Sequence, residues 1–122
     1  MLWRDDIVKI KAVANDAEEY SKLVEPIKKA PVLYIDDLFK TGKGADGYKQ
    51  QPTAADVNVA FEIINYRYNN TELLTLVSSE CTADDLLDID EATAGRILER
   101  ARVFSLRPDA RRNYRLRNVV SF

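Results

Sequence analysis

The chain has 122 residues, of which 46% are hydrophobic and 31% charged, so we expect one domain with a buried core. Its formal net charge is −2, which excludes a uniformly basic nucleic-acid-binding surface. Cys81 is the single cysteine, which excludes an internal disulfide. Histidine is absent, which excludes Ser-His-Asp and Cys-His catalysis. Both facts argue against a metal site of the His/Cys type. No apolar run reaches the length of a membrane span, and the first residues do not resemble a signal peptide, which favours a cytoplasmic protein without membrane partners.

The first third of the chain predicts two helices. Apolar residues at positions 3–14 recur with helical spacing, and charged residues fill the positions between them. A break follows, in which Asp16 is suited to cap a second helix over residues 17–30. Pro26 falls inside this second pattern, and we expect it to disturb the helix.

A short strand, a loop and a third helix are predicted next. Residues 32–35, Val-Leu-Tyr-Ile, predict a parallel strand buried on both faces, because apolar β-prone residues follow one another without polar alternation. Residues 39–52 hold three glycines and no periodicity, as in a long loop. Thr53 and Asp56 have the spacing of a capping box for a helix that ends near Asn69. The expected buried stripe of that helix is Val57, Ala60, Phe61, Ile64 and Tyr68.

The second half continues the alternation of strands and helices. Residues 73–77, Leu-Leu-Thr-Leu-Val, predict a second strand. Thr82 with Asp85, and then Asp90, predict the starts of two further helices. Late strands are expected at residues 103–106 and 113–120. This order is typical of an α/β fold.

Two adjacent carboxylates, Asp36 and Asp37, come directly after the first strand. Ligands of open α/β folds bind at the carboxyl edge of the sheet, and a strand-terminal aspartate there commonly holds Mg²⁺ through water beside a nucleoside triphosphate. Asp36 fits that role, and Asp37 can orient or deprotonate an attacking water. The same two residues are also explained if their carboxylates cap the turn that follows the strand. The sequence pattern alone does not decide between a nucleotide site and a capped turn.

Polar residues also follow the second strand. Ser78 would emerge at the same edge as Asp36 if the two strands run parallel. A small polar side chain there can hydrogen-bond a γ-phosphate or its attacking water. Taken alone, an ordinary strand-to-helix turn is the simpler interpretation of this segment.

The C-terminal segment, residues 96–118, is strongly basic, with eight arginines against two acids. Such a segment can contact phosphates of ATP or of single-stranded nucleic acid, or it can be a solvated face that pairs with nearby acids. Arg96 and Arg100 lie four residues apart on one helix face and can reach a phosphate bound by a neighbouring subunit.

Three ordered blocks, VLYIDDLFK, FEIINYRYNN and LVSSECTADDLLDIDEATAGRILERA, resemble the AAA+ domain of DnaC-type helicase loaders, especially those of the phage and Firmicute branch. The resemblance runs from about Trp3 to Arg117. It implies a three-layer αβα P-loop NTPase fold with a parallel sheet that is incomplete on its N-terminal side, so that residues 1–122 form a single partial AAA+ domain. Proteins of this family bind ATP and bring the ring-shaped replicative helicase onto single-stranded DNA during DNA replication.

The resemblance also implies roles for single residues. VLYIDD is similar to a Walker B strand, with Asp36 as the Mg²⁺-associated acid and Asp37 in the place of a catalytic glutamate that is one methylene longer. LVSSE is similar to sensor 1, with Ser78 where several relatives carry asparagine. AGRILER is similar to the segment with the arginine finger, for which Arg96 is the first candidate and Arg100 the second. Three arginines of the basic segment are the expected contacts with single-stranded DNA: Arg111, Arg112 and Arg115.

The chain departs from the family in one respect. It has no G-x-x-x-x-G-K-[ST] motif, whose backbone amides and lysine cradle phosphates; its one Gly-Lys pair, Gly42-Lys43, lacks the first glycine. The resemblance therefore implies a piece that starts after the P-loop, with residues 1–3 as the tail of a strand. An intact parent would be an ATPase using ATP and Mg²⁺, whereas this piece would bind ATP poorly and be inactive alone. The strand over 73–77 would then be an exposed apolar edge, which self-association can cover.

The leading hypothesis is thus the C-terminal part of a DnaC-like, ATP-dependent helicase loader that contacts a DnaB-type replicative helicase and single-stranded DNA. The alternative is a degenerate, non-catalytic phage interaction module that binds a replication factor and uses no nucleotide. A small α/β enzyme using Asp36 and Asp37 for acid–base chemistry is a weaker third hypothesis, since the sequence offers no nucleophile or substrate pocket for it.

Overall fold

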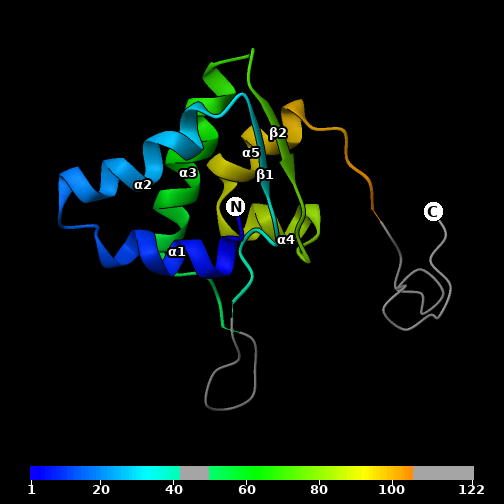
Figure 1. Ribbon diagram of the computed structural model, residues 1–122. Coiled ribbons are helices and arrows are strands. Elements are labelled where there is room, and N and C mark those ends of the chain that lie inside the picture. The colour runs from blue at the N-terminus through cyan, green and yellow to red at the C-terminus, as the bar shows by residue number, and fades with distance from the viewer. Residues whose placement is uncertain (42–49, 106–122) are drawn as a thin grey trace, which may run out of the picture.

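The computed structural model describes residues 1–41 and 50–105 (Figure 1). The helices and strands follow the predicted order: α1 (Trp3–Ala12), α2 (Ala17–Lys29), β1 (Val32–Ile35), α3 (Ala54–Asn69), β2 (Leu74–Val77), α4 (Ala83–Ile89) and α5 (Glu91–Arg100). No helix in this part of the chain is long and apolar enough to cross a membrane.

The sheet is built around a parallel pair of strands connected by α3. β1 and β2 pair with Val32 opposite Leu74 and Ile35 opposite Val77. The first residues of the chain lie along the other edge of β1, where Leu2 forms a parallel bridge with Asp36. The Asp36 N–H donates to the Met1 carbonyl at 2.9 Å, and the Trp3 N–H donates to the Asp36 carbonyl at 3.1 Å. Of residues 1–3, which were predicted to be the tail of a strand, Leu2 makes this single bridge and Trp3 already begins α1.

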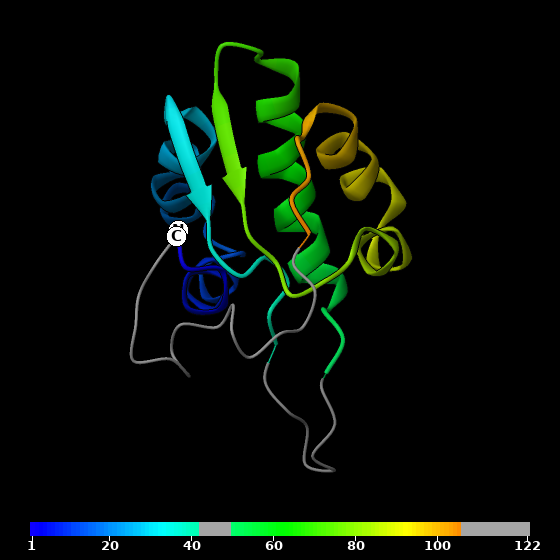
Figure 2. The same ribbon diagram turned by 90° about the vertical axis from the view of Figure 1, so that its right-hand side faces the viewer.

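Helices cover one face of the sheet and leave the other open. Figure 2 looks onto the open face, with α1 and α2 behind the strands. Val32 and Leu74 are 60% and 56% exposed on that face, whereas Leu33 and Ile35 are buried against the helices. The prediction that β1 is buried on both faces was therefore wrong for the described residues, because one helical layer covers it. A second helical layer is not seen within residues 1–41 and 50–105, so the three-layer architecture stays a prediction.

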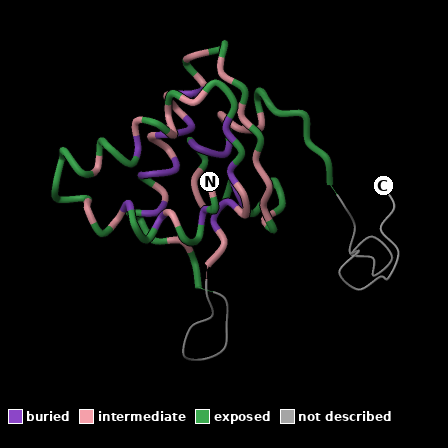
Figure 3. The backbone as a smooth tube through the Cα atoms, in the orientation of Figure 1, coloured by how far each residue is buried: buried purple, intermediate pink, exposed green. Residues whose placement is uncertain are grey.

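The core lies where α1, α2 and β1 meet α3 (Figure 3). Trp3 and Phe39 contact each other edge to face, with ring centroids 5.5 Å apart. The buried stripe of α3 is wider than predicted, since this helix packs against α1, α2 and α5. Of the five predicted stripe residues, Ala60 and Ile64 are buried, and the other three are half-buried. The stripe also contains residues that the prediction omitted: Asp56, Val59, Ile63 and Arg67.

The predicted helix starts are confirmed. Asp16 accepts a hydrogen bond from the Glu19 N–H at the start of α2. Complete capping boxes form between Thr53 and Asp56 and between Thr82 and Asp85. The Asp90 side chain caps α5 by accepting a bond from the Thr93 N–H. Side-chain caps of this kind typically contribute about 1 kcal/mol each. α2 continues past Pro26 to Lys29, so the proline does not end that helix.

Two strands were predicted near the C-terminus, over residues 103–106 and 113–120. Residues 101–105 form no strand, and Phe104 is 83% exposed. The predicted strand over 103–106 is therefore not formed in its described part, where no neighbouring strand supplies hydrogen-bond partners. The strand predicted over 113–120 lies outside the described residues.

A buried arginine joins the amino ends of the two strands. Arg67, in the last turn of α3, is 4% exposed. Its Nε donates to Thr75 Oγ1 at 2.7 Å, and its Nη2 donates to the Leu74 carbonyl at 2.7 Å. Its Nη1 donates to three carbonyls at the end of α2 and just beyond: Ile27 (3.2 Å), Lys28 (3.0 Å) and Ala30 (2.7 Å). Burial lowers the pKa of this guanidinium, while the negative end of the α2 dipole favours the charge.

We expect Arg67→Met to lower the free energy of unfolding by about 3 kcal/mol or more, because several buried carbonyls lose their donor. Urea denaturation measures this change. Arg4→Met is the matched control, since the Arg4 side chain is largely exposed, and it should change stability by less than about 0.5 kcal/mol. Equal effects of the two substitutions would contradict the structural role of Arg67.

An ion pair between the partly exposed Lys11 and the buried Asp56 joins α1 to α3. Lys11 Nζ lies 2.7 Å from Asp56 Oδ1, and Asp56 Oδ2 accepts a hydrogen bond from the Thr53 N–H at 2.9 Å. Burial by itself raises the pKa of Asp56, but the bonds from Lys11 and Thr53 outweigh it, so the pKa lies below its usual value.

This lowered pKa predicts the direction of acid destabilisation. A carboxyl group with a lower pKa in the folded state contributes stability above its unfolded pKa of about 4, and this contribution is lost as the pH falls through the folded value. We expect Asp56→Asn to be less stable than the wild type at pH 7 and to lose less additional stability below about pH 4. Urea denaturation across this pH range tests this, with the exposed Asp88→Asn as control. An unchanged pH slope in Asp56→Asn would show that Asp56 does not contribute.

Candidate functional site

The carboxyl ends of β1 and β2 bring Asp36 and Ser78 together. Ser78 Oγ donates to Asp36 Oδ1 at 3.0 Å. The backbone fixes this approach, because the Ser78 N–H donates to the Ile35 carbonyl at 3.0 Å and the Leu38 N–H donates to the Ser78 carbonyl at 2.8 Å. The prediction that Asp36 and Ser78 emerge at a shared edge of parallel strands is confirmed.

Tyr34 is a third member of this cluster, and the sequence reasoning missed it. Its hydroxyl lies 3.1 Å from Asp36 Oδ1 and 3.0 Å from Ser78 Oγ. Residues two apart on a strand point to the same face, so the spacing of Tyr34 and Asp36 was the available signal.

Asp37 lies in a sharp turn directly after β1. Its φ is 57°, in the left-handed region that aspartate tolerates better than most residues, and its N–H donates to Ser78 Oγ at 3.0 Å. Phe39 is also left-handed, with a φ of 64°, and its buried ring packs on Trp3. The turn thus directs Asp37 away from the strand while burying Phe39.

A lysine neutralises the charge around Asp37. Lys40 Nζ lies 3.8 Å from Asp37 Oδ2 and 3.5 Å from Glu80 Oε1. All three groups are partly exposed, so each pair is weak. The Asp37 carboxylate therefore lies beside a cation that a ligand phosphate can attract.

Asp36, Asp37 and Lys40 line a hollow of about 200 Å³ together with Leu2–Asp5 at the start of α1. Within the described residues no three acidic or cysteine side chains gather into a metal site. Mg²⁺ commonly uses one or two carboxylates and completes its shell with waters and substrate phosphates. Asp36 and Asp37 are the two carboxylates at this edge that are available for such a site.

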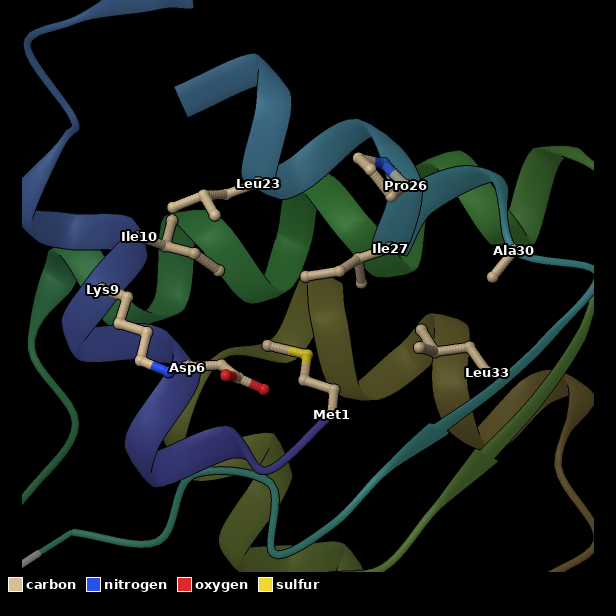
Figure 4. Close-up of a pocket in the computed structure, with 9 residues that line it drawn as sticks. All are labelled: Met1, Asp6, Lys9, Ile10, Leu23, Pro26, Ile27, Ala30 and Leu33. Atoms are coloured by element: carbon tan, nitrogen blue, oxygen red, sulfur yellow. The ribbon is translucent and has the colours of Figure 1, made fainter. Parts of the chain in front are cut away.

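A larger hollow, of about 330 Å³, lies between α1, α2 and the amino half of β1 (Figure 4). Its charged side chains are Asp6 and Lys9, and Asp6 accepts a hydrogen bond from the Leu2 N–H. The other residues that line it are apolar: Met1, Ile10, Leu23, Pro26, Ile27, Ala30 and Leu33. Convergent polar groups are found at the carboxyl edge of the strands and not here.

Arg96, the first candidate for an arginine finger, is engaged within the chain. Its Nε donates to Asn65 Oδ1 at 2.9 Å, and its Nη1 donates to the Ala92 carbonyl at 3.0 Å. Its guanidinium also lies 5.0 Å from the ring centre of Phe61 and 5.6 Å from that of Tyr68. These contacts hold α5 against α3.

Arg100 is exposed and is held more loosely. Its guanidinium lies over the Tyr68 ring at 4.2 Å. Tyr68 belongs to the last turn of α3, near the amino end of β2, so Arg100 lies at the opposite end of the strands from Asp36. The structure therefore does not bring either arginine to the Asp36 site of the same chain. The predicted nucleic-acid contacts, Arg111, Arg112 and Arg115, lie outside the described residues.

No protein-family model matches the chain, and no solved structure matches it. Two curated proteins of Bacillus subtilis (strain 168) are similar to it. Uncharacterized protein YqaM is 44% identical over 81 residues, which cover 65% of this chain and 24% of YqaM. Phage-like element PBSX protein XkdC is 38% identical over 85 residues, which cover 70% of this chain and 30% of XkdC. The matched segments therefore span about a quarter to three-tenths of these relatives.

Proposed function

We propose that the chain is the Walker B and sensor 1 portion of a DnaC-like, ATP-dependent helicase loader that acts in DNA replication in the cytoplasm. The observation that carries this proposal is the 3.0 Å hydrogen bond between Ser78 and Asp36 at the carboxyl edge of two parallel strands. P-loop NTPases hold Mg²⁺ with a strand-terminal aspartate at that edge, beside the γ-phosphate. The resemblance of the three sequence blocks to DnaC-type loaders, in which Asp36 and Ser78 take part, supports the same assignment.

The free edge of β2 also supports the proposal. In the described residues β2 pairs with β1 alone, and Figure 2 shows α3 and α5 extending past its free edge. In AAA+ sheets the P-loop strand lies beside the sensor 1 strand, which is the position next to the free edge of β2. Without such a strand, an apolar edge is open to pairing with a second copy of the chain.

Each site residue then has a distinct role. Asp36 holds Mg²⁺ through water, and the Ser78 hydroxyl donates to the γ-phosphate of ATP. Asp37 would orient the attacking water, and Lys40 beside it would attract the phosphate. Arg100 is the better candidate for contact with ATP on a neighbouring subunit, since Arg96 is engaged in packing α5 on α3.

A non-catalytic phage interaction module that binds the helicase or another replication factor is the second candidate. Two observations favour it. The 122 residues contain no P-loop motif, so the main phosphate contacts are absent from this chain. One relative, XkdC, is named as a protein of a phage-like element.

Nucleotide titration followed by amide NMR separates the two candidates. We expect millimolar MgATP to shift the backbone signals of Asp36, Asp37 and Ser78, and we expect these shifts to disappear with EDTA or in Asp36→Asn. The exposed Asp88→Asn is the matched control and should behave as the wild type. Absent shifts, together with retained binding to a DnaB-type helicase in size-exclusion chromatography, would favour the interaction module.

Single-stranded DNA binding tests the basic segment. Simultaneous replacement of Arg111, Arg112 and Arg115 by Ala should weaken binding and flatten the dependence of log K on log salt by about 2, because each lost phosphate contact removes about 0.7 from the slope. Fluorescence anisotropy with a labelled oligonucleotide at several salt concentrations measures both effects.

A second triple variant with the same loss of positive charge shows whether DNA binding depends on contacts of the basic segment or only on the net charge of the protein. Lys9, Lys22 and Lys29 are exposed on α1 and α2, and their joint replacement by Ala removes three positive charges elsewhere. The salt dependence should then stay close to that of the wild type. Equal effects of the two triple variants would contradict a specific role of the basic segment.

A further inference from the structure

We infer that Tyr34 is a positioning residue for the proposed nucleotide site: it fixes the Asp36 carboxylate and frees the Ser78 hydroxyl to turn toward a ligand phosphate. This inference rests on the proposed function for the identity of the ligand. The hydrogen-bond geometry that carries it stands without that function.

Three oxygen atoms form a closed triangle at the end of the strands. Ser78 Oγ lies 3.0 Å from Asp36 Oδ1, Tyr34 Oη lies 3.1 Å from the same Oδ1, and the two hydroxyl oxygens are 3.0 Å apart. The Asp36 carboxylate can only accept, and each hydroxyl has one proton to donate. Either hydroxyl can therefore supply the hydrogen bond that Asp36 Oδ1 receives.

This duplication fixes one carboxylate oxygen and leaves the other for the ligand. Both hydroxyls contact Oδ1, and within the described residues no donor contacts Oδ2. Asp36 lines the hollow that it shares with Asp37 and Lys40. An aspartate held through Oδ1 thus presents its second oxygen for a water of the Mg²⁺ shell, as partners behind a metal-binding carboxylate generally do.

The same duplication explains how Ser78 can change partners. In the structure Ser78 Oγ accepts a bond from the Asp37 N–H and donates to Asp36. When the Ser78 hydroxyl turns its proton toward a phosphate oxygen, the Tyr34 hydroxyl donates to Asp36 Oδ1 in its place. The carboxylate keeps a donor in both arrangements, so the exchange leaves no unsatisfied oxygen.

The competing explanation is that Tyr34 belongs only to the apolar open face of the sheet. Val32 and Leu74 lie on that face, and the Tyr34 ring is half exposed there. In that case its hydroxyl is incidental, and phenylalanine replaces it without consequence. The two explanations differ in what they predict for the side chain of Asp36.

The first test measures the χ1 rotamer of Asp36 by three-bond NMR couplings in Tyr34→Phe, Ser78→Ala and the double variant. We expect Asp36 to keep one rotamer in Ser78→Ala, where Tyr34 still donates, and to average between rotamers in the double variant. Tyr68→Phe is the matched control, because it removes an exposed hydroxyl that donates to Glu99 at 2.8 Å, far from Asp36. A fixed Asp36 rotamer in the double variant overturns the inference.

The second test uses Mn²⁺ alone as a probe for Mg²⁺, followed through paramagnetic broadening of the Asp36 signals. We expect the Tyr34→Phe/Ser78→Ala double variant to need about tenfold more Mn²⁺ than Ser78→Ala for equal broadening, because only the double variant leaves Asp36 Oδ1 without a donor. Tyr68→Phe should behave as the wild type. Equal Mn²⁺ requirements in the double variant and in Ser78→Ala overturn the positioning role of Tyr34 toward the metal. Absence of broadening in the wild type instead contradicts the metal site of the proposed function, and the coupling measurement still decides the role of Tyr34.

Discussion

The buried guanidinium of Arg67 is the contact on which the arrangement of the two strands depends. It binds the carbonyls at the end of α2 and, at the same time, Leu74 and Thr75 at the start of β2. β1 begins two residues after Ala30, so this one side chain ties the segment before β1 to the start of β2. The register then includes four residue pairs between β1 and β2, and the site follows the last of them. A slip of one strand by one residue would place Ser78 on the opposite face of the sheet from Asp36.

The open face and the free edge of the sheet determine what the site can do. Asp36, Asp37 and Ser78 supply oxygen ligands and a hydroxyl donor at the carboxyl edge, but the chain has no phosphate-cradling loop. Two surfaces of the sheet are left for further contacts: the free edge of β2, and the open face, where Val32 and Leu74 are exposed. Under the proposed function, a phosphate-cradling loop would have to join at the free edge of β2 to complete the nucleotide site.

The sequence predicted the features that depend on neighbouring residues. The caps at Asp16, Thr53, Thr82 and Asp90 could be predicted because a cap and its partner lie within three residues. The burial of β1 could not be predicted, since its apolar run fits a strand covered on one face as well as a strand covered on both. Which of the two forms depends on elements that are distant in the sequence. Arg67 was missed because its partners are carbonyls of remote segments, although an arginine within the apolar stripe of α3 was a usable signal.

The two helix arginines show why spacing alone could not assign their roles. Arg96 and Arg100 share a face of α5, so their spacing made them equivalent candidates. The packing of α5 separates them, since Arg96 lies against Phe61 and Asn65 of α3 while Arg100 stays exposed at the helix end. Because Arg96 fixes the orientation of α5, it also fixes the direction in which Arg100 leaves the molecule. If Arg100 contacts ATP on a neighbouring subunit, as we propose, the contacts of Arg96 supply the fixed helix that it needs.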